Sequence, residues 1–417
     1  MTTPSFSNAG FSRRRLLGTA LALGAAAPLA VPSRASASAA TPGAASGAMS
    51  AQATGSAAPA RLTLPAPTGP HRIGVVDLRI VDPSRPDPVA GPGRFRELMI
   101  SVWYPARVTG GETGRYPLAP WMPAASCAPY LVDRGFDPST IQVPLTAGHT
   151  GAPMLRVERR LPVVVYSHGA HDHRSDNTVA VQELASHGYA VVTIDHTYDA
   201  WVAFPDGRVL GPDPDVPMTP KDFAADARSV LDAIEELAAG RNPDADGRRL
   251  PEGLAGALDP HRTGMFGWSK GGTATAYTML TDARVRAGLS FDGPMAPTIT
   301  TDLDRPFMMM TGVFTRADDT DVAGFWSHLK GWRLNVQPEG AVHTCYSDIE
   351  SLMPQVAKAL GLSRQALEEY VGTLDPAEGV RMQQAYPRAF FDRHLRGRRS
   401  HLLDGPSPAF PDVKYLA

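Results

Sequence analysis

The sequence is poor in cysteine, and this scarcity removes whole classes of protein. Only Cys127 and Cys345 occur among 417 residues, so a metal site built from several cysteines is excluded. The two thiols leave two arrangements open: one disulfide formed in an oxidising compartment, or two separate buried thiols. With so few covalent links available, the 43% hydrophobic content must supply the stability through a large core.

An excess of positive charge is also missing. The formal net charge is −2, and loss of the segment 1–39, which carries Arg13, Arg14, Arg15, Arg34 and no acidic residue, would change the charge to −6. A mildly acidic chain is a poor partner for nucleic acid. The chain also has no glycine-rich phosphate loop and no dinucleotide fingerprint. We therefore expect neither nucleic acid nor a cofactor.

The apolar run near the amino terminus is too short to suggest a membrane span and is better explained as an export signal. Arg13-Arg14-Arg15 precedes a stretch rich in Ala, Leu and Gly that ends at Val31, and small residues follow at 35–39. This order is typical of a twin-arginine signal peptide with a cleavage site. We predict a signal over 1–39, an Ala/Ser/Gly-rich linker over 40–60, and a secreted or extracytoplasmic protein.

From residue 72 onward, short β-rich runs alternate with helical patterns. Such alternation predicts an α/β fold, a mostly parallel central sheet with helices on both faces. The expected strands are 73–80, 97–104, 161–167, 189–194, 262–266, 285–291, 306–311 and 332–336. The segments 178–187 and 223–239 carry apolar residues at helical spacing and are predicted to be crossover helices.

Three long stretches do not fit the alternation. They are the first insertion (105–160), the second insertion (196–220) and the third insertion (347–376). Long insertions at loop positions are where lids and substrate pockets are built. We therefore predict a single catalytic domain over 61–417 whose insertions form a cap.

The one G-x-S-x-G pattern of the chain is Gly267-Trp268-Ser269-Lys270-Gly271. An apolar run at 263–266 precedes it and a helix start at 272–277 follows, which is the strand-turn-helix that a nucleophile elbow requires. The two glycines lack the bulk that would prevent the strained turn from closing. These features predict an α/β-hydrolase fold with Ser269 as its nucleophile.

A serine hydroxyl needs a base to take its proton and an acid to orient that base. In this fold both come later in the chain, the acid first. His343 follows the last predicted strand in a loop and is the predicted base. His328, His394 and His401 lie on or beside predicted helices, so we interpret them as surface or packing histidines.

The residues themselves leave the acid open between two positions. Asp292 ends the strand that follows the elbow, whereas Asp318, Asp319 and Asp321 follow the next strand. Acids of α/β-hydrolases are found after either strand, and both positions can reach His343.

Several ordered motifs of the chain resemble the platelet-activating-factor acetylhydrolase family. They are Tyr166-Ser167-His168-Gly169, Gly267-Trp268-Ser269-Lys270-Gly271-Gly272, Leu289-Ser290-Phe291-Asp292-Gly293, Gly340-Ala341-Val342-His343 and Ala389-Phe390-Phe391-Asp392-Arg393-His394-Leu395. The resemblance extends over 103–396. It implies that Asp292 is the acid and that the enzyme is a carboxylic ester hydrolase acting on short-acyl phospholipids.

The negative oxygen of a tetrahedral intermediate needs two fixed N–H donors. The backbone of Lys270, at the start of the helix behind the serine, is the first predicted donor. The second is expected in the loop after the strand 161–167, and the resemblance implies Ala170. Lys270 stands where the family commonly has an apolar residue. We expect its ammonium to point into solvent rather than to select anionic substrates.

The group His168, His171, Asp172 and His173 contains residue types that bind zinc. The His168-Gly169 turn has a role in the oxyanion loop, and the other histidines fall in an open loop. No metal is therefore predicted.

These observations together favour a secreted serine esterase that cleaves short-acyl carboxylic esters, of the platelet-activating-factor type, through an acyl-enzyme. Two alternatives stay open: a broad carboxylesterase, lipase or polyester hydrolase, and a catalytically silent α/β-hydrolase fold that only binds. The predicted partner is a small-molecule or lipid ester, with transient contact to a lipid surface. The oligomeric state has no signal in the sequence.

Apolar side chains in the first and third insertions suggest where such contact would occur. They are Trp121, Met122, Tyr130, Leu131, Leu352, Met353, Val356, Leu360 and Leu362. They could line an acyl pocket or touch lipid, but we favour the interpretation that they pack the insertions onto the core.

Overall fold

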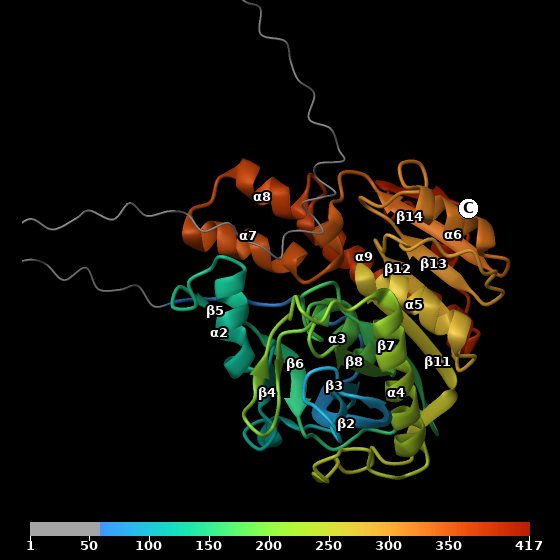
Figure 1. Cartoon of the computed structure of the whole chain (residues 1–417). Coiled ribbons are helices and arrows are strands. Elements are labelled where there is room, and N and C mark those ends of the chain that lie inside the picture. Colours follow the sequence, from blue (N-terminus) through green and yellow to red (C-terminus); the bar gives the residue numbers. More distant parts are fainter. Residues whose placement is uncertain (1–58) are drawn as a thin grey trace, which may run out of the picture.

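The computed structural model describes residues 59–417, so the predicted signal over 1–39 and nearly all of the linker over 40–60 lie outside it. An 11-stranded sheet runs through the described part in the order β15-β14-β13-β12-β11-β7-β8-β3-β2-β6-β4 (Figure 1). The strands from β14 to β8 are parallel, whereas β15, β3 and β4 each pair antiparallel with a neighbour. The mostly parallel sheet is the predicted one.

The strands of this sheet are β2 (Ile73–Pro86), β3 (Phe95–Pro105), β4 (Leu118–Pro120), β6 (Leu145–Thr150), β7 (Leu161–Ser167), β8 (Ala190–Asp195), β11 (Leu258–Trp268), β12 (Val285–Phe291), β13 (Phe307–Met310), β14 (Arg333–Pro338) and β15 (Val413–Leu416). Two small pairs are β1 (Ala60–Arg61) with β5 (Ile141–Gln142), and β9 (Val202–Ala203) with β10 (Val209–Leu210). The helices are α2 (Ala124–Asp133), α3 (Thr178–Ser186), α4 (Pro220–Ala238), α5 (Lys270–Thr281), α6 (Thr320–His328), α7 (Ile349–Leu360), α8 (Arg364–Val371) and α9 (Pro376–Arg396), with 3-10 turns η1 (Gly110–Glu112), η2 (His343–Tyr346) and η3 (His401–Leu403).

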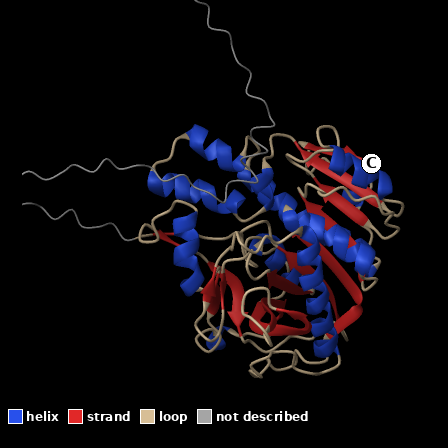
Figure 2. Ribbon diagram, in the orientation of Figure 1, coloured by secondary structure: helices blue, strands red, loops and turns tan. Residues whose placement is uncertain are grey.

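The apolar strand β7 shows why the sheet is covered on both faces. Every one of its residues is buried. Val163 and Val165 pack into one hydrophobic cluster with α4, α5 and α6, whereas Val164 and Tyr166 pack into another with α3 and α9. Because neighbouring side chains of a strand point to opposite faces, a continuous apolar run requires cover on both sides. Figure 2 shows helices on either side of the strand layer.

The predicted strands agree with the structure within a few residues, except that β2 continues to Pro86 and β11 starts earlier, at Leu258. The sequence does not predict the edge strands β4 and β15 or the strand β6 next to β4. They are short and mix polar residues or proline with few apolar ones, so their pairing depends on neighbours rather than on a local pattern. None of the helices of residues 59–417 is long and apolar enough to cross a membrane.

The first and third insertions share one apolar cluster, and α7 lies near the upper end of α2 in Figure 1. Seven of the nine apolar side chains singled out in the sequence are buried, which confirms packing for Trp121, Met122, Tyr130, Leu131, Leu352, Met353 and Val356. The other two, Leu360 and Leu362, are 40% and 37% exposed. The thiols of Cys127 and Cys345 are both buried and free, so they are two separate thiols and not a disulfide.

Asp348, at the start of the third insertion, joins three segments of the chain. Its carboxylate accepts the backbone N–H groups of Thr178 and Val179 at 2.9 Å each, and the indole N–H of Trp121 at 2.7 Å. It therefore caps the amino terminus of α3 and fastens the first insertion at the same time. Burial raises the pKa of this carboxyl to about 6, against the opposing effect of these donors.

A second buried acid on the third insertion makes the stability depend on pH. Burial, with the nearby charge of Asp375, raises the pKa of Glu350 from 4.5 to about 8. The folded state therefore binds this proton more tightly than the unfolded state, so the contribution to stability is full below about pH 4.5 and is lost as the pH rises to about 8. Replacement by glutamine removes that titration.

We expect the melting temperature of wild type to fall relative to that of Glu350→Gln between pH 6 and 8, by several degrees, in a thermal melt monitored by circular dichroism. Glu368→Gln is the matched control, because Glu368 lies on the exposed α8 in a surface ion pair with Arg364. Parallel pH curves for wild type and Glu350→Gln would contradict the expectation.

Candidate active site

Ser269 lies at the sharp turn between β11 and α5, with φ 55° and ψ −119°. This left-handed conformation is unfavourable for a residue with a β-carbon and is held by the structure around it. The two glycines of the motif permit the turn: a β-carbon on Gly267 would meet the backbone of Gly271 at 2.3 Å, and one on Gly271 would meet the carbonyl oxygen of Ser167 at 2.0 Å. The steric reason expected for both glycines is confirmed.

Asp292 and His343 are joined directly, through 2.6 Å between Oδ2 and the ring Nδ1. Asp292 follows β12 and is fully buried, whereas the side chain of His343 is 24% exposed. The other carboxylate oxygen accepts the backbone N–H groups of Gly312 at 2.7 Å and Phe314 at 3.0 Å. These donors satisfy the buried carboxylate and fix its orientation toward the imidazole.

Two aromatic side chains hold the imidazole of His343. The indole N–H of Trp268 donates to its backbone carbonyl at 3.0 Å, and the two rings lie 5.1 Å apart. Phe314 meets the imidazole edge-on at 5.3 Å. Neither contact had a signal in the sequence beyond the neighbouring position of Trp268 in the elbow motif.

The rival acids have other partners. Asp319 caps α6 by accepting the N–H groups of Asp321 at 2.8 Å and Val322 at 3.1 Å. Asp318 accepts the hydroxyl of Thr315 at 2.9 Å. Of the two positions that the residues left open, the structure therefore brings Asp292 to the histidine.

The rival histidines are engaged elsewhere, as interpreted from the sequence. His328 ends α6 and contacts Asp302 at 2.6 Å on the surface. His394, in α9, lies against the ring of Trp332 at 4.5 Å, and burial lowers its pKa to about 4. His401 is exposed and begins η3.

The two amides predicted to bind an oxyanion follow the neighbouring strands β7 and β11 of the sheet. Lys270 is the first residue of α5, where backbone N–H groups have no partner within the helix. Ala170 is exposed in the loop after β7, and the neighbouring Gly169 allows that loop to pass the ring of Trp268, which a β-carbon would meet at 2.5 Å. Within residues 59–417, neither amide donates a hydrogen bond to a protein acceptor.

The expectation that the ammonium of Lys270 points into solvent is wrong. Its side chain is only 18% exposed, and Nζ lies 2.5 Å from Oδ2 of Asp199 and 2.9 Å from the carbonyl oxygen of Met218. The second insertion folds back over the elbow and supplies both partners. A sequence pattern gives no sign of such a contact, because the two residues are far apart in the chain.

A second Ser-His-Asp arrangement lies beneath the site. Ser167 Oγ is 2.7 Å from Nε2 of His196, whose Nδ1 is 3.0 Å from Asp226. All three residues are fully buried, so this serine cannot meet a substrate. The arrangement ties the end of β7 to β8 and α4, and it supports the oxyanion loop from below.

The four residues whose types suit zinc, His168, His171, Asp172 and His173, have other partners in the structure. His168 accepts the N–H of His196 at 3.1 Å, and burial keeps its pKa well below the usual value. His173 is packed edge-on between the rings of Trp121 and Tyr130, at 4.6 and 4.9 Å.

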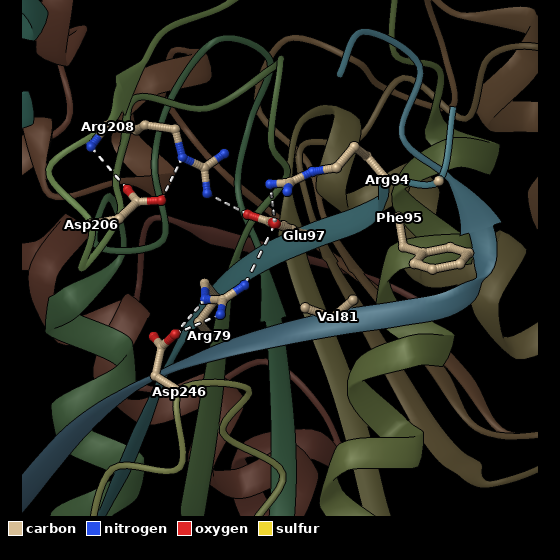
Figure 3. A pocket seen from close by; sticks show the side chains of 9 residues that line it. Arg79, Val81, Arg94, Phe95, Glu97, Asp206, Arg208 and Asp246 are labelled. Atoms are coloured by element: carbon tan, nitrogen blue, oxygen red, sulfur yellow. Dashed lines mark hydrogen bonds and ion pairs between the residues drawn. The ribbon is translucent and has the colours of Figure 1, made fainter. Parts of the chain in front are cut away.

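A hollow of about 340 Å³ opens beside the hairpin of β2 and β3, away from the residues described above. Its charged lining comprises Arg79, Arg94, Arg208, Glu97, Asp206 and Asp246. Figure 3 shows each arginine paired with an acid: Glu97 lies 3.5 Å from Arg79, 3.7 Å from Arg94 and 2.5 Å from Arg208. Since these charges neutralise one another, the hollow has no evident part in ester chemistry.

Comparisons with known proteins show which family the chain resembles over most of its length. The model of the family "Platelet-activating factor acetylhydrolase, isoform II" matches residues 58–203 and 224–401. A protein of Arthroderma benhamiae named "Probable 1-alkyl-2-acetylglycerophosphocholine esterase" is 25% identical over 88% of this chain and 97% of its own. The platelet-activating factor acetylhydrolase of Cavia porcellus is 23% identical over 69% of each chain. The solved ferulic acid esterase of Streptomyces cinnamoneus is 29% identical, with a TM-score of 0.68 over 85% of this chain and 99% of its own.

Proposed function

Because the chain belongs to the platelet-activating factor acetylhydrolase isoform II family and is a carboxylic ester hydrolase with the α/β-hydrolase fold, we propose a specific reaction for it. The enzyme cleaves short-acyl lipid esters through an acyl-enzyme on Ser269. Two observations support the proposal. Asp292 and His343 are hydrogen-bonded, and Ser269 has the unfavourable backbone conformation of a nucleophile elbow. A binding protein without chemistry would have no need for either feature.

In the proposed reaction, His343 takes the proton of Ser269 as the hydroxyl oxygen attacks the ester carbonyl. The N–H groups of Ala170 and Lys270 bind the oxygen that becomes negative. Collapse of the tetrahedral intermediate breaks the C–O bond, and the histidine gives its proton to the leaving alcohol. Water then attacks the acyl-enzyme by the same steps, releasing the acid and restoring the serine. Asp292 keeps the imidazole in the required tautomer throughout.

Packing of the insertions supports a short acyl group. Seven of the apolar side chains near the site contact one another in the cluster formed by the first and third insertions, so they are not free to line a long tunnel. Each buried CH₂ of an acyl chain is worth about 0.8 kcal/mol of binding, and a shallow site gains this only for the first few carbons. The names of the two relatives, a platelet-activating factor acetylhydrolase and a probable 1-alkyl-2-acetylglycerophosphocholine esterase, also favour a short acyl group.

We expect catalytic efficiency on p-nitrophenyl esters to be highest between acetate and butyrate and to fall toward palmitate. A phospholipid with an acetyl group at the second glycerol position should be cleaved faster than its long-chain counterpart. Activity is collected outside the cytoplasm of a host that expresses the full chain, because we propose that residues 1–39 direct export. Activity confined to the cytoplasm would contradict export alone, whereas an optimum at twelve carbons or more would contradict the short-acyl site.

A second candidate function, a broader esterase, is favoured by the likeness to the ferulic acid esterase. Methyl ferulate and methyl acetate distinguish the two candidates when they are assayed beside the acetyl phospholipid. Cleavage of both methyl esters with none of the phospholipid would establish the broader esterase and remove the lipid substrate.

A further inference from the structure

We propose that Asp199 and Lys270 form a brace that fixes the spacing of the two oxyanion donors, so that Asp199 is a positioning residue of the active site. The inference rests on the proposed function and deepens it. Asp199 lies at the start of the second insertion, just after β8, and none of the sequence motifs includes it.

The two oxygens of one carboxylate reach both sides of the oxyanion site. Oδ1 of Asp199 accepts the backbone N–H of His171 at 2.7 Å. Oδ2 lies 2.5 Å from Nζ of Lys270. His171 directly follows Ala170, which carries one donor, and the backbone of Lys270 is the other. A single buried group therefore contacts the loop of the first donor and the side chain of the second.

The brace is itself fixed in place. Asp199 is 2% exposed, and its own N–H donates to the carbonyl of His196 at 2.8 Å. The ammonium of Lys270 also donates to Met218 and lies 5.1 Å over the ring of Phe223 at the start of α4. A buried charge pair with its remaining donors satisfied is held far more firmly than an exposed one.

The loop that carries Ala170 needs such external support. His171 has φ 60°, a left-handed conformation that L residues with a β-carbon rarely adopt. Two contacts hold it there: Asp199 binds its N–H, and Arg134 donates to its carbonyl at 2.7 Å. Without the carboxylate acceptor the peptide next to Ala170 is free to turn, and its neighbouring donor would move with it.

A displaced donor stabilises the transition state less well, and it affects the bound ester to a smaller extent. The reason is that full negative charge develops on the oxygen only during the reaction. Loss of one oxyanion donor costs about 10² to 10³ in kcat, and a misplacement of about 1 Å costs about 10². Since the brace positions the donors and is not itself one, we expect a smaller loss.

The test uses Asp199→Asn and Lys270→Met in the full chain, assayed on p-nitrophenyl acetate. We expect kcat and kcat/KM to fall together by about 10- to 100-fold, which is the sign of an interaction made only in the transition state. The pH profile should not move, because the contact between Asp292 and His343 is untouched. Lys270→Arg keeps the charge and should recover a large part of the loss.

Arg396→Met is the matched control for stability. Arg396 is also a largely buried cation in an ion pair, 3.0 Å from Glu158, and it donates to the carbonyls of His187 and Gly188, but it lies in α9 and not in the elbow. The Arg396→Met variant should lower the melting temperature as Lys270→Met does. Its kcat should stay within about threefold of wild type, because Arg396 lies away from the reacting groups.

A second readout comes from an aryl trifluoromethyl ketone, whose adduct with the serine places an anionic oxygen between the two donors. Its affinity should fall by the same factor as kcat/KM in the two brace variants and stay unchanged in Arg396→Met. This holds even where a variant is less stable, since binding is measured on the folded fraction below its melting temperature.

The outcomes separate this inference from the function it rests on. If wild type hydrolyses the ester and both brace variants keep kcat and ketone affinity within about threefold, the brace is refuted while the esterase stands. If wild type neither hydrolyses esters nor binds the ketone, the proposed function fails first. A loss of kcat that Arg396→Met reproduces at equal destabilisation would also overturn the positioning role.

Discussion

Replacing Ser269 by alanine should lower ester hydrolysis by more than about 10⁴-fold, because no other group can form the acyl-enzyme. The fold should survive. The left-handed turn at this position is a property of the backbone and of the glycines around it, and alanine has the same β-carbon as serine. Measurement of kcat/KM on p-nitrophenyl acetate, with a thermal melt, checks both statements.

Covalent labelling sharpens this test. A fluorophosphonate probe should modify wild type and fail on Ser269→Ala. Ser167→Ala is the matched control, since it removes the serine of the buried Ser167-His196-Asp226 arrangement, which the probe cannot reach. Labelling that persists in Ser269→Ala, or hydrolysis by this variant within tenfold of wild type, would mean that another residue is the nucleophile. Absence of labelling in wild type would favour a silent binding fold.

The second large effect concerns the acid. Asp292→Asn should reduce kcat by about 10³- to 10⁴-fold, because an amide in this position favours the wrong tautomer of His343 and does not stabilise its charged form. The backbone donors at Gly312 and Phe314 would still have an oxygen to bind, so the fold should be little affected.

Asp319→Asn is the matched control for the acid. Asparagine caps a helix as well as aspartate does, so α6 keeps its cap and kcat should change little. Both variants are measured by single-turnover and steady-state kinetics on the same acetyl ester. The reverse ranking would assign the acid to the loop after β13 and would remove the support that the family resemblance gives to Asp292.

Local patterns predicted the parts of the molecule that depend on local chemistry. The run of β7 predicts a strand covered on both faces because its residues are apolar in succession. The glycines at 267 and 271 predict a tight turn because their neighbours lie close in the chain. In both cases the determining contacts are made by, or beside, the residues that form the pattern.

Contacts between distant segments explain what was missed. The environment of Lys270 depends on Asp199, which is separated from it by 71 positions and comes from an insertion with no recognisable motif. Edge strand β15 depends on β14 for its hydrogen bonds. The residues alone left the acid open between Asp292 and Asp319, and the family resemblance implied Asp292, which lies 2.6 Å from His343. No local periodicity records which loops meet across the end of a sheet.

The position of Asp348 has a consequence for how the substrate preference of such an enzyme can change. Since this one carboxylate holds Trp121, the start of α3 and the third insertion together, mutations in the first and third insertions act on a shared anchor. Their effects on chain-length preference should therefore be epistatic rather than additive. Adaptation to a new ester would proceed through paired substitutions in the two segments, and a library that varies either segment by itself would sample mostly poorly anchored variants.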